Sequence, residues 1–197
     1  MKHHGQLDLL ISANKGIIRT ADAVAAGVPR PTFYRFVRER GLERVSHGIY
    51  ADSHAWTDAM FLLSLRSTQV VFSHETALFL HDLTDREPTY YSVTVKTGYN
   101  PSRLRAYGVK VYTVKRELYM IGMSKARTSF GNEVRAYDPE RTICDIVRSR
   151  NQIEIQTLQD ALKQYARRND KNLRRLMHYA EAFQVDKILN RYLRVLL

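Results

Sequence analysis

The stretch Thr20–Asp52 constrains the fold of this 197-residue chain more than any other. Thr20 has the side chain of a good helix N-cap, and the residues Ala21–Ala26 favour a short helix that a glycine ends. After a Val-Pro turn, apolar residues recur at helical spacing within Arg30–Arg40, which predicts a second helix with its phenylalanines directed inward. The two helices and their tight turn therefore predict a helix-turn-helix.

A two-stranded ribbon is predicted directly after this helix pair. Leu42–Val45 and Ile49–Ala51 are expected to form its strands, and Gly48 between them supplies the positive φ that a tight turn can need. An apolar helical run and a short extended segment precede Thr20. The order helix, strand, helix, turn, helix, ribbon is that of a winged helix-turn-helix domain, which we expect over residues 1–53.

The second predicted helix carries residue types that read and clamp duplex DNA. Arginine can pair with both acceptors of a guanine edge or with phosphate, and the major groove admits a helix. The expected major-groove residues are Arg30, Thr32, Tyr34, Arg35 and Arg38. The expected contacts to the DNA backbone are Lys15, Arg19, Thr20 and His47. The alternative is a small helical unit that contacts another protein.

The net charge of +11 favours a polyanionic partner, and nucleic acid is the commonest one. The alternative is a basic protein whose charge only aids solubility. Residues 1–55 carry +3 of this charge and the remainder +8. Charge alone therefore does not single out the first domain, because the second is basic too.

Residues 56–197 predict an α/β domain with a helical C-terminal end. Extended segments are expected at Val70–Phe72, Thr89–Lys96, Val109–Lys115, Tyr119–Met123 and Asn132–Tyr137. Helices are expected at Trp56–Leu65, Ser73–Leu83, 153–168, 170–183 and 185–195, with a further one starting at Asp138. That start is strong, because Asp138 suits the N-cap and Pro139 the first helical position. The predicted fold class is α/β, with a winged helix-turn-helix followed by a mixed α/β domain.

No metal site stands out in this second domain. His74, Glu75, His81 and Asp82 have a spacing that matches no familiar zinc pattern, so packing or surface positions are the stronger interpretation. Cys144 lies on an apolar helical face, where a thiol usually acts as a small hydrophobe. We therefore expect no metal and no cofactor.

A nuclease-like pattern is present but incomplete. Asp82, Asp85 and Glu87 precede a strand that ends with Thr94 and Lys96, where a metal-dependent nuclease would have an acid in place of the threonine. Without that acid a metal could not be held in the usual way. The sequence therefore predicts no catalytic residues and no enzyme activity.

Two charged features lie in the C-terminal helices. Arg141 and Asp145 have the i, i+4 spacing of a helical ion pair, for which a surface or capping position is the favoured interpretation. A basic run further on is either an interaction surface or a solvated face. Its members are Lys163, Arg167, Arg168, Lys171, Arg174 and Arg175.

The sequence predicts a cytoplasmic protein without a membrane partner. No apolar run approaches the ~20 residues that span a bilayer, and the N-terminus lacks the apolar core of a signal peptide. A single cysteine excludes an internal disulfide and fits a reducing compartment. The chain has no heptad pattern and no long apolar interface segment, which favours a monomer in solution that pairs on DNA.

With both halves considered, the sequence resembles the AbiEi family, the antitoxins of type IV toxin–antitoxin (abortive infection, phage defence) systems. The most specific part of the resemblance is GIIRTADAVAAGVPRPTFYRFVRERGLERVSHGIYA in the winged helix. Supporting strings in the second domain are VVFSHETALFLHDL and YDPERTICDIVR. In related proteins that domain is similar to a restriction-endonuclease core without catalysis, which agrees with threonine at position 94.

The resemblance implies a repressor that binds inverted repeats in double-stranded DNA at its own operon promoter. It also implies a second domain that neutralises a nucleotidyltransferase-like toxin, without necessarily forming a stable complex with it. The hypothesis is therefore an autorepressor joined to an antitoxin domain. The alternative is a non-catalytic protein- or RNA-interaction module whose winged helix does not read DNA.

Overall fold

The computed structural model divides the chain into two compact units, residues 1–57 and 58–197. It describes residues 3–53 and 58–196. Every helix within these ranges is too short or too polar to span a bilayer.

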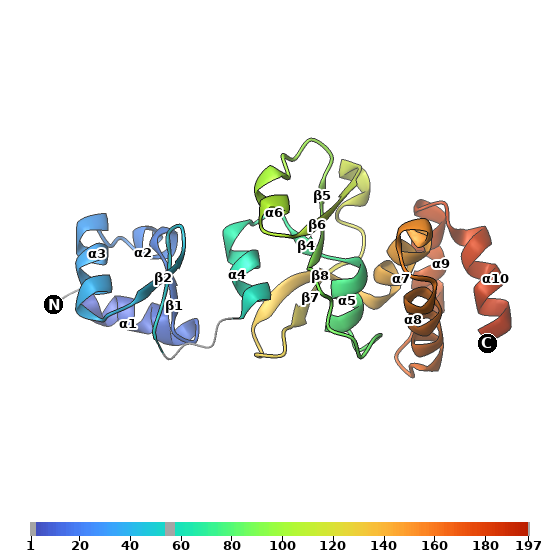
Figure 1. The fold of residues 1–197 in the computed structure, drawn as a ribbon, viewed down its shortest axis with the longest axis horizontal. Helices are drawn as coiled ribbons and strands as arrows, with labels where there is room; N and C mark the ends of the chain where they lie inside the picture. Colours follow the sequence, from blue (N-terminus) through green and yellow to red (C-terminus); the bar gives the residue numbers. More distant parts are fainter. Residues whose placement is uncertain (1–2, 54–57, 197) are drawn as a thin grey trace. The chain divides into compact units, whose positions relative to one another are not determined.

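The N-terminal unit combines three helices with a three-stranded antiparallel sheet (Figure 1). Its helices are α1 (His4–Ala13), α2 (Thr20–Ala25) and α3 (Arg30–Glu39). Its strands are β1 (Ile17–Arg19), β2 (Glu43–Ser46) and β3 (Ile49–Ala51), in the order β1-β3-β2. This arrangement confirms the predicted helix-turn-helix with a ribbon.

The core of this unit is aromatic and aliphatic, as the helical spacing predicted. Phe33, Phe36 and Val37 of α3 are buried against Leu7 of α1 and Ile18 of β1. Because these side chains take one face of α3, its polar residues are left on the opposite face.

The predicted N-cap of α2 is wrong. The helix begins at Thr20 itself, with Arg19 in the N-cap position and no side-chain capping hydrogen bond. The N–H of Thr20 instead donates to the carbonyl of Gly48, across 2.8 Å, at the tip of the ribbon. Gly48 has a φ of +68°, as the turn prediction required. The backbone of Thr20 is thus held against the ribbon.

The C-terminal unit is built on a five-stranded mixed sheet with the order β6-β5-β4-β8-β7. Its strands are β4 (Val71–Phe72), β5 (Ser92–Lys96), β6 (Lys110–Val114), β7 (Met123–Arg127) and β8 (Glu133–Tyr137). The pairs β5–β6 and β4–β8 are parallel, whereas β4–β5 and β7–β8 are antiparallel. Strands β6 and β7 are therefore the edges of the sheet.

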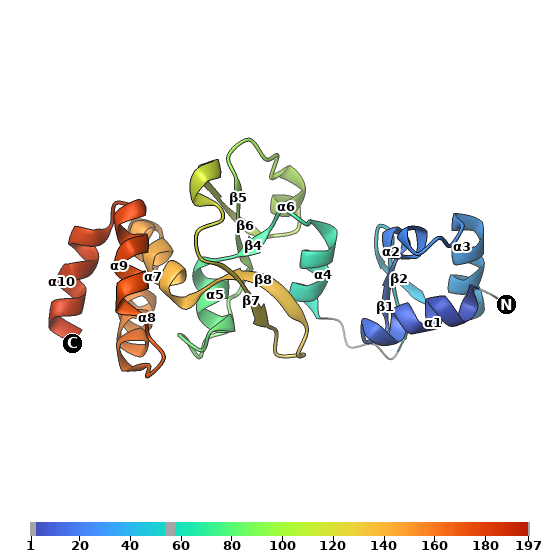
Figure 2. The same ribbon diagram turned by 180° about the vertical axis from the view of Figure 1, so that it is seen from behind.

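Helices cover both faces of this sheet, and two views show them on opposite sides (Figures 1 and 2). One side has α4 (Ala59–Arg66) and α6 (Ser102–Ala106), and the other has α5 (His74–Leu80) and α7 (Pro139–Arg148). Successive side chains at β4 point to opposite faces of the sheet and so contribute to both hydrophobic cores. Val71 packs in one cluster, and Val70 and Phe72 pack in the other.

The chain ends in helices that pack on α7, which confirms the predicted helical C-terminal end. They are α8 (Ile155–Arg167), α9 (Leu173–Ala182) and α10 (Asp186–Leu196), and 3-10 turns lie at η1 (Arg116–Leu118) and η2 (Arg150–Gln152). The predicted start of α7 is also confirmed, since the Asp138 carboxylate accepts from the Arg141 N–H across 2.8 Å.

The extended segment predicted at Tyr119–Met123 is wrong. These residues form turns after η1, and β7 begins only at their end. The backbone reverses at Gly122 with a φ of +70°. The carbonyls of Leu118 and Ile121 accept hydrogen bonds from the Arg141 guanidinium, at 2.9 and 2.7 Å. A distant buried arginine therefore fixes this turn, and local alternation could not predict it.

The surface position predicted for the Arg141–Asp145 pair is also wrong. Arg141 is fully buried and Asp145 is 3% exposed, with 3.0 Å between Nε and Oδ1. The guanidinium lies between the rings of Tyr137 and Phe183, about 4 Å from each centroid. Helix α7 packs against α5, α8, α9 and α10, and this packing buries the pair.

Candidate nucleic-acid interface

Helix α3 presents most of the residues predicted for the major groove on its exposed surface. Arg30, Tyr34, Arg35 and Arg38 are exposed, and Thr32 is half-buried. Because Arg30, Tyr34 and Arg38 are spaced by four residues, they form one row along the helix. All three residues of this row are exposed, whereas Phe33 and Phe36 are buried.

The arginines of this unit differ in whether they have a partner inside it. Arg40, at the end of α3, forms an ion pair with Asp8 of α1, with 2.5 Å between the nitrogen and the oxygen. Arg35 lies 3.8 Å from Glu39. Arg30 and Arg38 have no ion pair or hydrogen bond with any side chain that the structure describes. These two guanidinium groups are therefore the cations of α3 that are available to an external anion.

Tyr34 lies between these two arginines and is held in place by other rings. It is 43% exposed, and its ring makes edge contacts with Phe33 and Tyr50 at centroid distances of 5.5 and 6.3 Å. Tyr50 belongs to β3, so the ribbon helps to orient this residue of α3. Tyr34 thus combines an accessible surface with a fixed ring, which lowers the entropy lost on contact with DNA.

Two residues predicted for the DNA backbone lie before β1 and at its end. Lys15 is exposed in the turn before the strand, with a left-handed φ of +51°. Arg19 forms a bidentate pair with Asp22, at 2.7 and 2.5 Å, and this hydrogen bonding raises the pKa of Arg19. Arg19 would therefore have to leave or share its carboxylate to bind a phosphate.

The other two predicted backbone residues meet at the ribbon. Thr20 is half-buried, and its hydroxyl has no hydrogen-bond partner among the described residues. His47 is exposed at the tip, where its Nδ1 lies 2.9 Å from the Arg44 guanidinium. Since a guanidinium only donates, Nδ1 accepts and the ring proton lies on Nε2.

Arg44 is a residue that the sequence reasoning missed. It is an exposed cation on β2 beside His47, so it adds positive charge to the predicted ribbon tip. Its exposure is evident only from the folded strand, which is exposed at Glu43 and Arg44 and half-buried after them.

The histidines of the C-terminal unit do not assemble a metal site. His74 is buried and its two nitrogens lie 3.0 Å from the hydroxyls of Ser73 and Ser149. His81 contacts the Tyr137 carbonyl, and its pKa is lowered, mainly by burial. Within residues 3–53 and 58–196, no three acids, histidines or cysteines are grouped as metal ligands.

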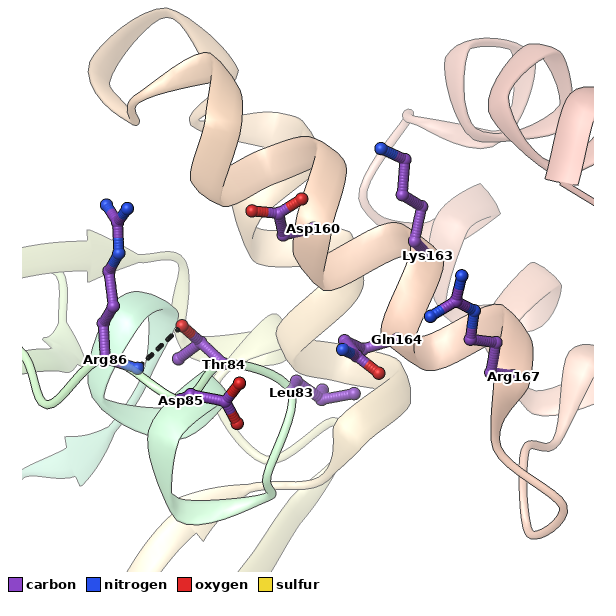
Figure 3. Close-up of a pocket in the computed structure, with 8 residues that line it drawn as sticks. All are labelled: Leu83, Thr84, Asp85, Arg86, Asp160, Lys163, Gln164 and Arg167. Atoms are coloured by element: carbon purple, nitrogen blue, oxygen red, sulfur yellow. Dashed lines mark hydrogen bonds between the residues drawn. The ribbon is translucent and has the colours of Figure 1, made fainter.

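The nuclease-like residues are separated as well. Asp85 lines a surface pocket together with Lys163 and Gln164 of α8 (Figure 3). Thr94 is buried in the sheet, where its hydroxyl donates to Ser73, and Lys96 lies over the ring of Tyr119. No acid–acid–lysine arrangement is formed by these positions.

Some residues of the predicted basic run form ion pairs within the C-terminal unit, and others do not. Arg168 pairs with Asp170, and Arg175 lies 3.8 Å from the buried Glu140. Lys163 and Arg167 lie one turn apart on the pocket face of α8 and have no ion-pair partner among the described residues (Figure 3). Two exposed cations of α8 therefore remain without an ion-pair partner among the described residues.

Residues 6–51 match the family model described as "Transcriptional regulator, AbiEi antitoxin". The N-terminal unit is therefore similar to the AbiEi antitoxins, and we call it the AbiEi unit. The matched residues of this AbiEi unit include α3 and the ribbon, and therefore all nine predicted DNA-contacting positions. No curated protein matches the chain significantly.

A solved structure shares the fold of the whole chain. The crystal structure of the RV2827C protein from Mycobacterium tuberculosis aligns with 98% of this chain and 81% of that one, with a TM-score of 0.52 and 13% identity. At this identity the likeness concerns the fold alone. It extends across both units, beyond the part of the chain that the AbiEi model matches.

Proposed function

We propose that the chain is a DNA-binding autorepressor joined to an antitoxin domain. The AbiEi unit binds inverted repeats in its own promoter, and the C-terminal unit counteracts a nucleotidyltransferase-like toxin in the cytoplasm. The observation that carries the DNA-binding part is the row on α3. Arg30 and Arg38 have no partner among the described residues, and they flank a fixed, exposed Tyr34.

In this proposal α3 enters the major groove and the ribbon follows the adjacent backbone. Arg30, Tyr34 and Arg38 make the principal groove contacts, and Thr32 and Arg35 lie beside them. The backbone contacts are Lys15, Arg19, Thr20 and His47, with Arg44 added at the ribbon. An inverted repeat suits two copies of a monomer, because the two half-sites then present the same surface in opposite orientations.

A mobility-shift assay with the chain's own promoter tests the DNA-binding part. Arg30→Ala and Arg38→Ala should each weaken binding by about 1–3 kcal/mol if each arginine reads a base. The matched control is Arg40→Ala, since Arg40 follows the same helix but is already paired with Asp8. Equal affinities for all three variants and the wild type would exclude the proposed interface.

A truncated chain of residues 58–197 tests the antitoxin part. Co-expressed with the nucleotidyltransferase from the neighbouring reading frame, it should restore growth without binding the promoter. Loss of rescue by a folded truncated chain would show that neutralisation requires the AbiEi unit.

The alternative function, a protein- or RNA-interaction module, is favoured by the uncommitted Lys163 and Arg167. Lys163→Glu with Arg167→Glu should then abolish rescue in the full chain while leaving promoter binding unchanged. Rescue by this variant would exclude α8 as the interaction surface.

A further inference from the structure

A polar pocket of about 380 Å³ lies in the C-terminal unit, between edge strand β6 and the end of α7. Its volume falls within the ~300–1,000 Å³ typical of small-molecule sites. The residues that give it chemical character are His74, Thr94, Tyr112, Asp145, Arg148 and Ser149. None of them belongs to the proposed DNA interface.

Asp145 brings a buried acceptor without a partner to this pocket. Its Oδ1 accepts from Arg141, but its Oδ2 has no hydrogen-bond partner among the described residues although the residue is 3% exposed. Because an unpaired buried polar atom is costly, Asp145 Oδ2 favours a ligand that donates a hydrogen bond.

An aromatic pair forms part of the same wall. The rings of His74 and Tyr112 are stacked with their centroids 3.4 Å apart and their planes 7° from parallel. The hydroxyls of Ser73 and Ser149 hold the imidazole, whose residue has a left-handed φ of +50°. Burial lowers the pKa of His74 well below its usual range, with a further contribution from Lys110, so the ring stays neutral. A neutral, fixed aromatic pair is suited to contact with a planar base.

Arg148 brings a positive charge to the edge of this pocket. It is exposed in the last turn of α7, lines the pocket, and has no ion-pair partner among the described residues. Its guanidinium carbon lies 5.8 Å from the centroid of the Phe183 ring. The planar fork of an arginine can hold two phosphate oxygens at once.

We infer that this pocket binds a nucleoside monophosphate. The base would donate a hydrogen bond to Asp145 Oδ2 and lie near the Tyr112–His74 pair, while Arg148 holds the phosphate. Inorganic phosphate fits less well, because beside Asp145 it brings further negative charge to a buried carboxyl group. The inference concerns a site apart from α3 and does not depend on DNA binding.

Calorimetry with the full chain and the four 5′-ribonucleoside monophosphates tests the inference. At least one should bind with a Kd below roughly 1 mM, and ribose 5-phosphate should bind at least about tenfold more weakly. Arg148→Gln should weaken the monophosphate about tenfold, the loss expected for one charge-assisted hydrogen bond, and should not affect the corresponding nucleoside. Arg174→Gln is the control, since Arg174 is exposed on α9 outside the pocket.

Asp145→Asn supplies a second test. It keeps the side-chain size and an oxygen for Arg141 but replaces the free acceptor with a donor, so it should weaken monophosphate and nucleoside alike. The absence of binding by all four monophosphates would overturn the inference. So would equal binding of ribose 5-phosphate, which indicates a simple anion site, or an Arg148→Gln variant that binds as the wild type does.

Discussion

The two units of this protein use arginine in opposite ways. On α3 of the AbiEi unit, Arg30 and Arg38 are exposed and have no partner among the described residues. In the C-terminal unit, Arg141 is fully buried and bonds to a carboxylate and two carbonyls between two aromatic rings. The number of arginines therefore says little about function, whereas their burial and partners separate a binding surface from a structural centre.

Arg141→Ala should give the largest effect if the buried arginine organises the C-terminal unit. Removing one partner of a buried ion pair typically costs about 3–5 kcal/mol, because Asp145 is left uncompensated. Urea unfolding followed in the C-terminal unit measures this loss, and promoter binding at low temperature reports on the AbiEi unit. A loss below ~1 kcal/mol would contradict a structural role for Arg141.

Gly122→Ala should give the second largest loss of stability, because the turn at Gly122 lies directly against Arg141. A Cβ at this position would clash with the Arg141 Cβ, and the backbone has a φ of +70°. We expect a loss of roughly 2–4 kcal/mol from clash and strain together.

Gly108→Ala is the matched control for this clash. Gly108 has a similar φ of +73° but nothing within 4 Å of an added Cβ, so only strain of about 1–2 kcal/mol applies. Equal losses for the two variants in urea unfolding would show that contact with Arg141 does not matter.

Acidification should weaken the C-terminal unit through its buried histidine. The pKa of His74 is lowered in the folded state, chiefly by burial, from an ordinary value of 6.5. Its contribution is therefore complete above about pH 6.5 and declines below it, by up to ~1.4 kcal/mol per pH unit until the folded-state pKa is reached.

Urea unfolding between pH 7.5 and 5 measures this decline. His74→Gln should flatten it, whereas His178→Gln, which changes an exposed residue of α9, should leave the profile of the wild type. A His74→Gln profile identical to the wild type would exclude His74 as a source of the pH dependence.

Arg40→Ala should have the smallest effect. Arg40 and Asp8 form an ion pair with side chains 55% and 39% exposed, and such pairs contribute about 0–1 kcal/mol. Thermal unfolding should change little, and a loss above ~2 kcal/mol would show that the AbiEi unit also depends on a paired arginine.

Local signals in the sequence predicted much of the fold. The helix-turn-helix, the ribbon with Gly48 at its turn, and the start of α7 at Asp138 follow from residue preferences over a few positions. The predicted α/β class and helical C-terminal end are confirmed for the same reason.

Distant contacts explain what the sequence could not predict. Thr20 is held by the ribbon, and the turn after η1 is fixed by Arg141, whose partners lie up to 23 positions away. The i, i+4 spacing of Arg141 and Asp145 is the same on a surface helix and in a core, so only the packing of α7 decided between them. The DNA contacts of α3 remain a prediction, although the partners of each arginine now rank the candidates.

The affinity of the Arg30→Ala/Arg38→Ala double variant for its promoter, titrated over salt concentration, tests the central claim most directly. The variant should lose at least about 30-fold in affinity if each arginine contributes ~1–3 kcal/mol through base contacts. If the arginines instead bind phosphates, the slope of log affinity against log salt should fall by about one for each. Curves that superimpose on those of the wild type at every salt concentration would contradict the assignment of α3 as the DNA-reading surface.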